Sequence, residues 1–182
     1  MEIPSAPIDK RYHEAFEWIA SRTSLRPKIG IVCGSGLGKF AETLEEPQFF
    51  EYKDIPHFPV STVPGHKGRL VFGKVGGKNV VCMQGRFHLY EGYPASACAF
   101  PIRLFKLFGV EKLALTNAAG GLNPDYKMGD FMIVKDHINL PGLVGLHPTI
   151  GERDLFWGPR FTNMFNCYDL NLRKLAKEVA RL

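Results

Sequence analysis

Glycines around one serine follow a short apolar run near the N-terminus, and this arrangement is typical of an anion pocket. The apolar residues 29–33 lead directly into Gly34-Ser35-Gly36-Leu37-Gly38. An apolar run that ends in glycines predicts a buried strand that leaves its sheet through a tight loop. Glycines let backbone N–H groups approach a ligand, and a helix expected over residues 39–44 would add the positive end of its dipole. The sequence therefore predicts a phosphate pocket in which the Ser35 hydroxyl donates to an oxyanion.

Other glycine-rich motifs fit this loop less well. A P-loop requires Ser or Thr after Gly-Lys, but Phe40 follows Lys39. The nucleophile elbow does not fit, because the glycines around Ser35 are out of place. A dinucleotide fingerprint needs a glycine where Lys39 stands, although Asp54 lies at a suitable distance for a ribose-binding acid. The dinucleotide alternative therefore stays open at this point.

A second group of side chains that can bind an anion follows another expected strand, in Gln84-Gly-Arg-Phe-His-Leu-Tyr-Glu-Gly92. The alternation puts Arg86 and His88 on the same side of the chain, where two donors can converge on one oxyanion. The alternative, an ion pair between Arg86 and Glu91 on the surface, explains the arginine but not the histidine beside it.

Small residues follow a third expected strand, in Thr116-Asn-Ala-Ala-Gly-Gly-Leu-Asn-Pro124. They let a planar ligand lie against bare backbone, whereas a plain turn needs only one glycine. We expect the three strand exits, at Gly34, Gly85 and Gly120, to converge at the carboxyl ends of a parallel sheet, where ligands bind in α/β folds.

Two further segments carry polar residues with weaker signals. His66 stands in a glycine-rich loop before a strand, and a lone loop histidine is more often structural than catalytic. Asp136, His137 and Asn139 form a polar cluster, but no further acid or histidine stands at ligand spacing. We therefore expect no metal site.

The elements that must position these loops follow from hydrophobic periodicity and turn residues. We expect helices over residues 12–21, 95–108 and 171–182. The expected strands are 28–33, 48–52, 69–75, 78–84, 112–117 and 130–135, with a hairpin at Gly76-Gly77 and a long loop over 136–159. Strand, helix and strand in that order form a parallel crossover, which predicts an α/β sheet.

Composition narrows the class of protein. The chain has 182 residues, of which 45% are hydrophobic, so it is one domain or part of one. Its 23 basic and 18 acidic residues are scattered, which argues against a nucleic-acid binder and favours a small anionic substrate. It has neither an apolar stretch of membrane-spanning length nor a leader sequence, so we expect a soluble cytoplasmic protein. The four cysteines are far apart, and most of them are expected to be reduced and buried: Cys33, Cys82, Cys98 and Cys167.

The last expected helix has an apolar face and no C-terminal capping residue. Leu172, Leu175 and Val179 lie on that face, and an apolar face requires a partner surface. We infer that the chain is a C-terminally shortened form of a larger domain.

Together these segments closely resemble the trimeric, animal-type purine nucleoside phosphorylases. The resemblance runs from about Tyr12 to the end of the chain and is carried by the segments 33–38, 63–73, 84–94, 116–124 and 136–142. It implies a three-layer αβα fold with a mixed, partly barrel-like central sheet. It also implies that residues 1–182 are a single nucleoside phosphorylase domain that lacks its C-terminal portion. The implied reaction is reversible phosphorolysis of inosine, guanosine or their 2′-deoxy forms to the free purine and α-(deoxy)ribose 1-phosphate, in purine salvage.

The resemblance also implies roles for individual residues. Phosphate is expected to contact Ser35, Arg86, His88 and the backbone N–H of Ala118, with His66 close by. The nucleoside is expected to contact Tyr90 at the ribose, Ala118, Ala119 and Gly120 at the purine, and Phe161 from the adjacent subunit. The resemblance implies a homotrimer with inorganic phosphate as co-substrate, and it implies no metal, organic cofactor, nucleic acid or membrane.

The chain departs from the family pattern in several places. Lys67 stands where the family usually has a small residue, His147 replaces the usual asparagine before Pro148, and residues 151–158 match poorly. The family also continues well beyond Leu182, and that part holds the glutamate and asparagine that grip the purine and the histidine that orients the ribose. None of the family's base-activating residues is therefore expected in this chain. A catalytically inactive form that acts only as a phosphate-binding or subunit-interacting module stays open as an alternative.

Overall fold

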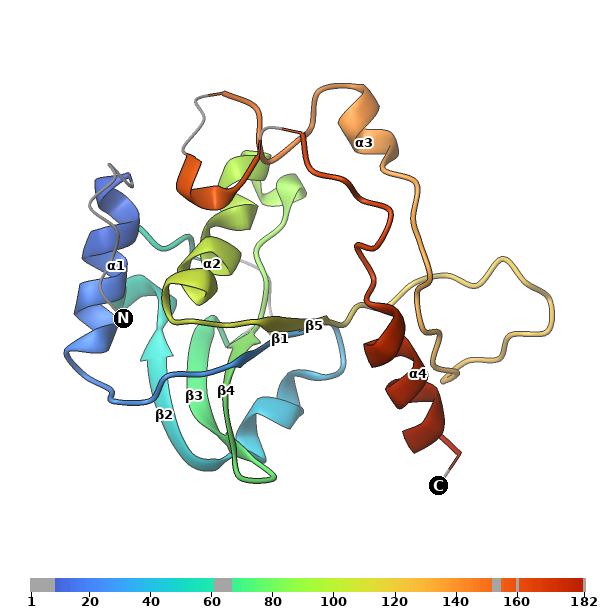
Figure 1. The fold of residues 1–182 in the computed structure, drawn as a ribbon, viewed down its shortest axis with the longest axis horizontal. Helices are drawn as coiled ribbons and strands as arrows, with labels where there is room; N and C mark the ends of the chain where they lie inside the picture. The colour runs from blue at the N-terminus through green and yellow to red at the C-terminus, as the bar shows by residue number, and fades with distance from the viewer. Residues whose placement is uncertain (1–8, 61–66, 152–154, 160, 182) are drawn as a thin grey trace.

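A five-stranded mixed sheet forms the centre of the computed structural model, which describes residues 9–60, 67–151, 155–159 and 161–181 (Figure 1). The strands are β1 (Ile29–Cys33), β2 (Glu45–Glu51), β3 (Arg69–Val75), β4 (Lys78–Gln84) and β5 (Lys112–Leu115). Their order in the sheet is β2-β3-β4-β1-β5. β1 pairs in parallel with β4 and β5, whereas β3 pairs antiparallel with β2 and β4. The predicted α/β class with a mixed sheet is confirmed.

The hairpin predicted between the third and fourth strands is confirmed. Val75 pairs with Lys78 across a turn made of Gly76 and Gly77. Both glycines have positive φ, 53° and 72°, as the tight turns that match the twist of antiparallel strands require. This dipeptide therefore determines the register of β3 against β4.

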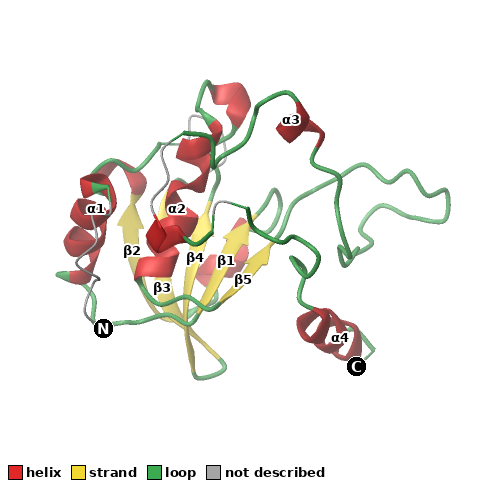
Figure 2. Cartoon of the chain, turned by 45° about the horizontal axis from the view of Figure 1, so that its top comes forward, coloured by secondary structure: helices red, strands yellow, loops and turns green. Residues whose placement is uncertain are grey.

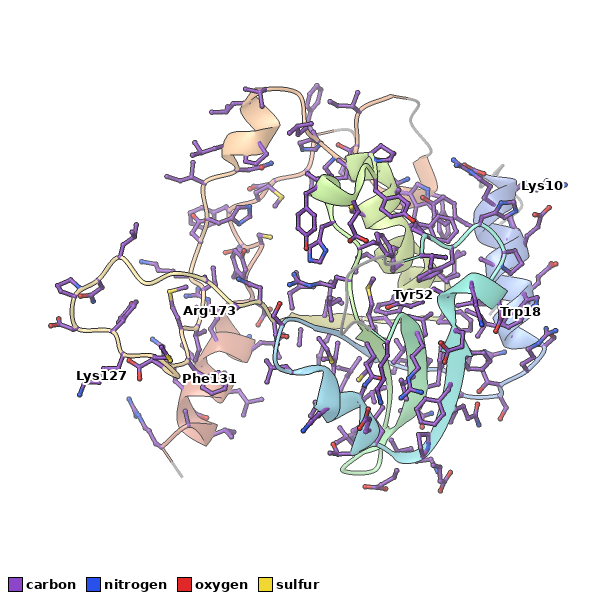
Figure 3. All side chains as sticks on the ribbon, turned by 180° about the vertical axis from the view of Figure 1, so that it is seen from behind. Lys10, Trp18, Tyr52, Lys127, Phe131 and Arg173 are labelled. Atoms are coloured by element: carbon purple, nitrogen blue, oxygen red, sulfur yellow. The ribbon has the colours of Figure 1, made fainter. Side chains whose placement is uncertain are left out.

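The strand predicted over residues 130–135 is wrong. The segment is coil, and Phe131 and Met132 are exposed. An apolar run becomes a strand only where a neighbouring strand or a core covers it, and in the described part of the chain no strand pairs with this segment. Figure 3 shows Phe131 and Lys127 in a loop that projects away from the sheet, far from the central Tyr52.

Two longer helices follow the predictions closely. They are α1 (Lys10–Ala20) and α2 (Ala95–Leu107), and both cover the same face of the sheet (Figures 1 and 2). Asp9 caps α1, because its carboxylate accepts from the backbone N–H of Arg11 at 3.0 Å. Among the described helices, none is long and apolar enough to cross a membrane.

The shorter helical segments differ from the predictions. The helix expected after the first glycine loop is the 3-10 helix η1 (Gly38–Glu42). The other 3-10 helices are η2 (Tyr52–Asp54), η3 (Leu89–Glu91) and η4 (Leu155–Trp157). A short helix that the sequence did not predict, α3 (Leu140–Leu143), lies in the long glycine- and proline-rich loop.

The sheet separates two hydrophobic clusters. The larger cluster lies between the sheet and helices α1 and α2 and includes Ile19, Phe72 and Leu104. The smaller cluster lies on the opposite face beside η1 and includes Ala41 and Val71. Alternate residues of one strand supply the two faces.

The last helix is confirmed, but its apolar face is exposed. It is α4 (Leu170–Val179), and Figures 1 and 2 show it beside the main body rather than on a sheet face. Leu172, Leu175 and Val179 are 38%, 54% and 59% exposed. The helix therefore forms from its own sequence and cap, without a buried face within the described structure.

Candidate functional site

The carboxyl ends of three parallel strands bring the predicted loops to one edge of the sheet. Cys33 at the end of β1 pairs with Gln84 at the end of β4, and Val32 pairs with Leu115 at the end of β5. The chain then leaves the sheet at Gly34, Gly85 and Thr116. The three exits therefore lie side by side, as the sequence predicted.

The first loop is held tightly against the exit of β5. The N–H of Gly34 donates to Thr116 Oγ1 at 2.8 Å, and that hydroxyl donates to the carbonyl of Val32 at 2.9 Å. A Cβ on Gly34 would lie 2.2 Å from the carbonyl oxygen of Thr116, so only glycine fits. A turn closed by the Leu37 N–H on the Gly34 carbonyl, at 3.0 Å, then presents Ser35 on the surface.

The loop after β4 alternates buried and half-buried side chains. Phe87 is buried in the core, and Arg86 and His88 on either side of it are half-buried. Behind this loop, the phenol of Tyr52 donates to the carbonyl of Gly85 at 2.7 Å. Burial raises the pKa of Tyr52 well above its ordinary value, so the phenol stays protonated and remains a donor. The core therefore fixes the direction in which the loop leaves the sheet.

Glu91 holds His88 in one orientation. Its Oε1 lies 2.9 Å from His88 Nδ1 and also accepts from the backbone N–H of His88 at 2.7 Å. The Glu91 side chain is only 3% exposed. The sequence left Glu91 open as a partner for Arg86, and the structure places the Glu91 carboxylate beside His88. The spacing of a helix cap, with an acid three residues into η3, was the signal that could have found this pair.

The predicted nucleoside contacts are more exposed. The Tyr90 ring stacks on His88 with centroids 4.6 Å apart, and Tyr90 is 74% exposed. Ala118, Ala119 and Gly120 follow β5 and are exposed. The segments that follow the strand ends at this edge of the sheet thus carry all five of these residues: Ser35, Arg86, His88, Tyr90 and Ala118.

The remaining predicted site residues are Phe161 and His66. Phe161 is 90% exposed, in the coil between η4 and α4. His66 lies outside the described residues.

His137 pairs with the hydroxyl of Tyr168 at 2.9 Å, and the described segments contain no group of three or more metal-ligating side chains.

The sequence also missed a polar cluster directly behind the first two loops. Gln84 is 3% exposed, and its amide bonds to the carbonyl of Gly38, the carboxylate of Glu42 and the guanidinium of Arg69. Lys67 pairs with the same carboxylate. Hydrogen bonds from Lys67 and Gln84 hold the pKa of Glu42 below its ordinary value. The buried polar end of an otherwise apolar strand was the one sequence signal for this cluster.

Comparison with known proteins places these observations in a family. Residues 28–182 match the model of the phosphorylase superfamily. A purine nucleoside phosphorylase from Anopheles gambiae is 56% identical over 168 residues, which are 92% of this chain and 48% of that protein. The chain thus spans about half the length of this curated relative.

Solved structures agree with the sequence comparison. A schistosoma purine nucleoside phosphorylase in complex with hypoxanthine superposes with a TM-score of 0.89 at 47% identity, over 95% of this chain and 61% of that one. A purine nucleoside phosphorylase in complex with ribose-1-phosphate gives a TM-score of 0.89 at 48% identity, over 94% of this chain and 63% of that one. The chain therefore belongs to the phosphorylase superfamily, and the resemblance to its purine nucleoside phosphorylases that the motifs indicated is confirmed.

Proposed function

We propose that this chain carries the phosphate-binding part of a purine nucleoside phosphorylase. The observation that supports this most strongly is the position of Ser35, Arg86 and His88 on adjacent loops at one sheet edge. The relatives named above hold a purine base or a sugar phosphate, which are the two kinds of product that phosphorolysis of a purine nucleoside gives. We place the reaction in the cytoplasm.

In the proposed reaction, inorganic phosphate lies between the three loops. The Ser35 hydroxyl, the Arg86 fork, His88 and the Ala118 N–H are its donors, with His66 nearby. The glycosidic C–N bond breaks with its electron pair going to the purine, and a phosphate oxygen bonds to the anomeric carbon. Because the sugar becomes cationic before capture, the bound phosphate dianion stabilises the transition state as well as attacking it. This mechanism uses no metal and no organic cofactor.

The orientation of His88 follows from its contact with Glu91. Glu91 Oε1 lies 2.9 Å from His88 Nδ1, so Nε2 is the ring nitrogen through which His88 would bind a phosphate oxygen. Glu91 is therefore a positioning residue that fixes the direction of the His88 ring.

The remaining nucleoside contacts are part of the same proposal. Tyr90 would meet the ribose, Ala118, Ala119 and Gly120 would face the purine, and Phe161 would complete the pocket of an adjacent subunit in a homotrimer. The purine-gripping residues that the family resemblance implies stand in a part that this chain does not contain. We therefore expect the 182-residue chain to bind phosphate but to release hypoxanthine from inosine at a negligible rate, because each lost transition-state contact costs about a hundredfold in rate.

Calorimetric titration with inorganic phosphate tests this proposal. We expect one saturable site in the wild-type chain and a loss of about tenfold or more in affinity in Arg86→Ala, because a bidentate charged donor is removed. Arg11→Ala is the matched control, since Arg11 is exposed on α1 and pairs with Asp9. Equal phosphate affinity in wild type and Arg86→Ala would remove Arg86 from the site.

A further inference from the structure

The cluster behind the phosphate loops has a role of its own. We propose that Gln84 and Glu42 are positioning residues that hold the Gly34–Gly38 loop and the exit of β4 at a fixed separation. They would act on phosphate affinity without touching phosphate. The inference rests on the proposed function, and it extends the site to a layer of residues that the motifs do not include.

Gln84 joins the two loops through both ends of its amide. Its Nε2 donates to the carbonyl of Gly38 at 2.8 Å and to Glu42 Oε1 at 3.0 Å, and its Oε1 accepts from Arg69 Nε at 2.7 Å. Both amide hydrogens and the oxygen are thus engaged. A buried amide bonded on all sides has one orientation, because any rotation leaves a polar group unsatisfied.

The backbone of Gln84 anchors this amide in the sheet. Gln84 pairs with Cys33 of β1 and with Arg69 of β3, and its carbonyl accepts from the N–H of Gly68 at 3.0 Å. Its side chain then reaches back to Gly38, the last residue of the first loop. Ser35 stands three residues before Gly38, and Arg86 stands two residues after Gln84. The amide therefore links the segments that carry two predicted phosphate donors.

Glu42 closes the cluster on the side of η1. Its carboxylate accepts from Gln84, pairs with Lys67, and lies 3.8 Å from Arg69 Nη2. Arg69 is itself 4.0 Å from Glu51, so two cations face two carboxylates. Because the charges of this cluster compensate one another, it offers little attraction to phosphate. Its contribution is geometric.

The first test measures how firmly the loop is held, with no ligand present. The amides of Gly34 and Leu37 are hydrogen-bonded, so their hydrogen exchange reports opening of the loop. Gln84→Glu keeps the size of the side chain, removes the donor to Gly38 and places a second carboxylate beside Glu42. We expect exchange at Gly34 and Leu37 to become faster by a larger factor than global exchange does. Unchanged exchange at both amides would overturn the inference.

The second test measures affinity for inorganic phosphate by calorimetry. We expect Gln84→Glu to weaken it about tenfold, because the buried carbonyl of Gly38 loses its donor. Glu42→Gln still offers an oxygen acceptor to Gln84, and residue 42 lies at the protein surface. This variant should therefore weaken phosphate affinity only about threefold. The control is Glu46→Gln, which removes the 2.8 Å ion pair to Lys74 at the other end of β3. The control should leave phosphate affinity unchanged.

A double variant separates positioning from stability. In Gln84→Glu with Glu42→Gln, the amide at position 42 can donate to the carboxylate at position 84, which removes the repulsion. Global stability should recover, whereas phosphate affinity should stay low because Gly38 still lacks its donor. If stability and phosphate affinity both recovered in the double variant, Gln84 would have a structural role only. If the wild-type chain bound no phosphate, the proposed function would fail. The exchange experiment would still decide whether Gln84 holds the Gly34–Gly38 loop in place.

Discussion

At the scale of single residues, the sequence identified groups that can touch phosphate but not those that orient them. Ser35, Arg86 and His88 stand out because their types suit an oxyanion and glycines precede or separate them. Gln84 and Glu91 show their roles only in three dimensions, since each acts through hydrogen bonds to a neighbour. The cap spacing at Glu91 and the polar end of an apolar strand at Gln84 do not tell which partner each side chain contacts, and this is why the second group was missed.

The His88–Glu91 pair gives a prediction at this scale. Glu91→Gln keeps an acceptor for the backbone N–H of His88 but replaces the carboxylate beside Nδ1 with a neutral amide, which holds the ring less firmly. Because charge-assisted hydrogen bonds are about twice as strong as neutral ones, phosphate affinity should fall about threefold to tenfold. Glu17→Gln on the exposed side of α1 is the control. Calorimetry that finds both variants equal to wild type would show that Glu91 does not act through His88.

At the scale of elements, predictions held where local sequence and tertiary packing agree. The β3–β4 hairpin was predictable because Gly76-Gly77 and two apolar runs specify it locally, and the pairing of Val75 with Lys78 follows. The segment 130–135 has the apolar composition of a strand but is coil, because pairing is a tertiary property. A helix was expected over residues 39–44, and the structure has the short 3-10 helix η1 there. The side-chain amide of Gln84 donates to the carbonyl of Gly38, the first residue of η1.

Two helices with similar caps should respond differently to the same substitution. Asp9 accepts from the N–H of Arg11 at 3.0 Å, and Asp169 accepts from the N–H of Leu172 at 2.8 Å. Asp9→Ala should lower the free energy of unfolding by about 1 kcal/mol, because α1 is packed on the core. Asp169→Ala should leave global unfolding unchanged and reduce helicity alone, since α4 buries no residue. Urea unfolding followed by fluorescence and circular dichroism would show equal losses in the two variants if this distinction were wrong.

At the scale of the whole molecule, the chain is divided between a packed sheet region and an exposed second part. The buried residues of both hydrophobic clusters all precede β5, and Phe156 and Trp157 are partly buried against the larger one. Large apolar side chains after Leu113 are otherwise mostly exposed, among them Leu115, Met128, Phe131 and Phe165. Exposed apolar area of this kind indicates an interaction surface or an aggregation hazard. The motifs predicted the three loops at the strand ends correctly. They did not indicate how few of the residues after β5 are buried.

This distribution predicts self-association of the isolated chain. Light scattering should show an apparent mass that rises with protein concentration. Leu175→Glu with Val179→Lys should reduce this rise without changing phosphate affinity, because both positions are exposed on α4 and lie on none of the phosphate loops. Lys174→Glu is the control on the same helix. A monodisperse monomer at all concentrations would contradict the prediction.

The central claim is that phosphate binds at the carboxyl edge of the sheet, and an NMR titration with inorganic phosphate tests it most directly. We predict that amide shifts change at Gly34–Gly38, Arg86–His88 and Ala118. The competing location is a basic hollow at the opposite edge, where Arg26, Lys28, Lys78 and Lys112 gather. Shifts confined to these basic residues and Gly77, with the glycine loop unmoved, would contradict the account.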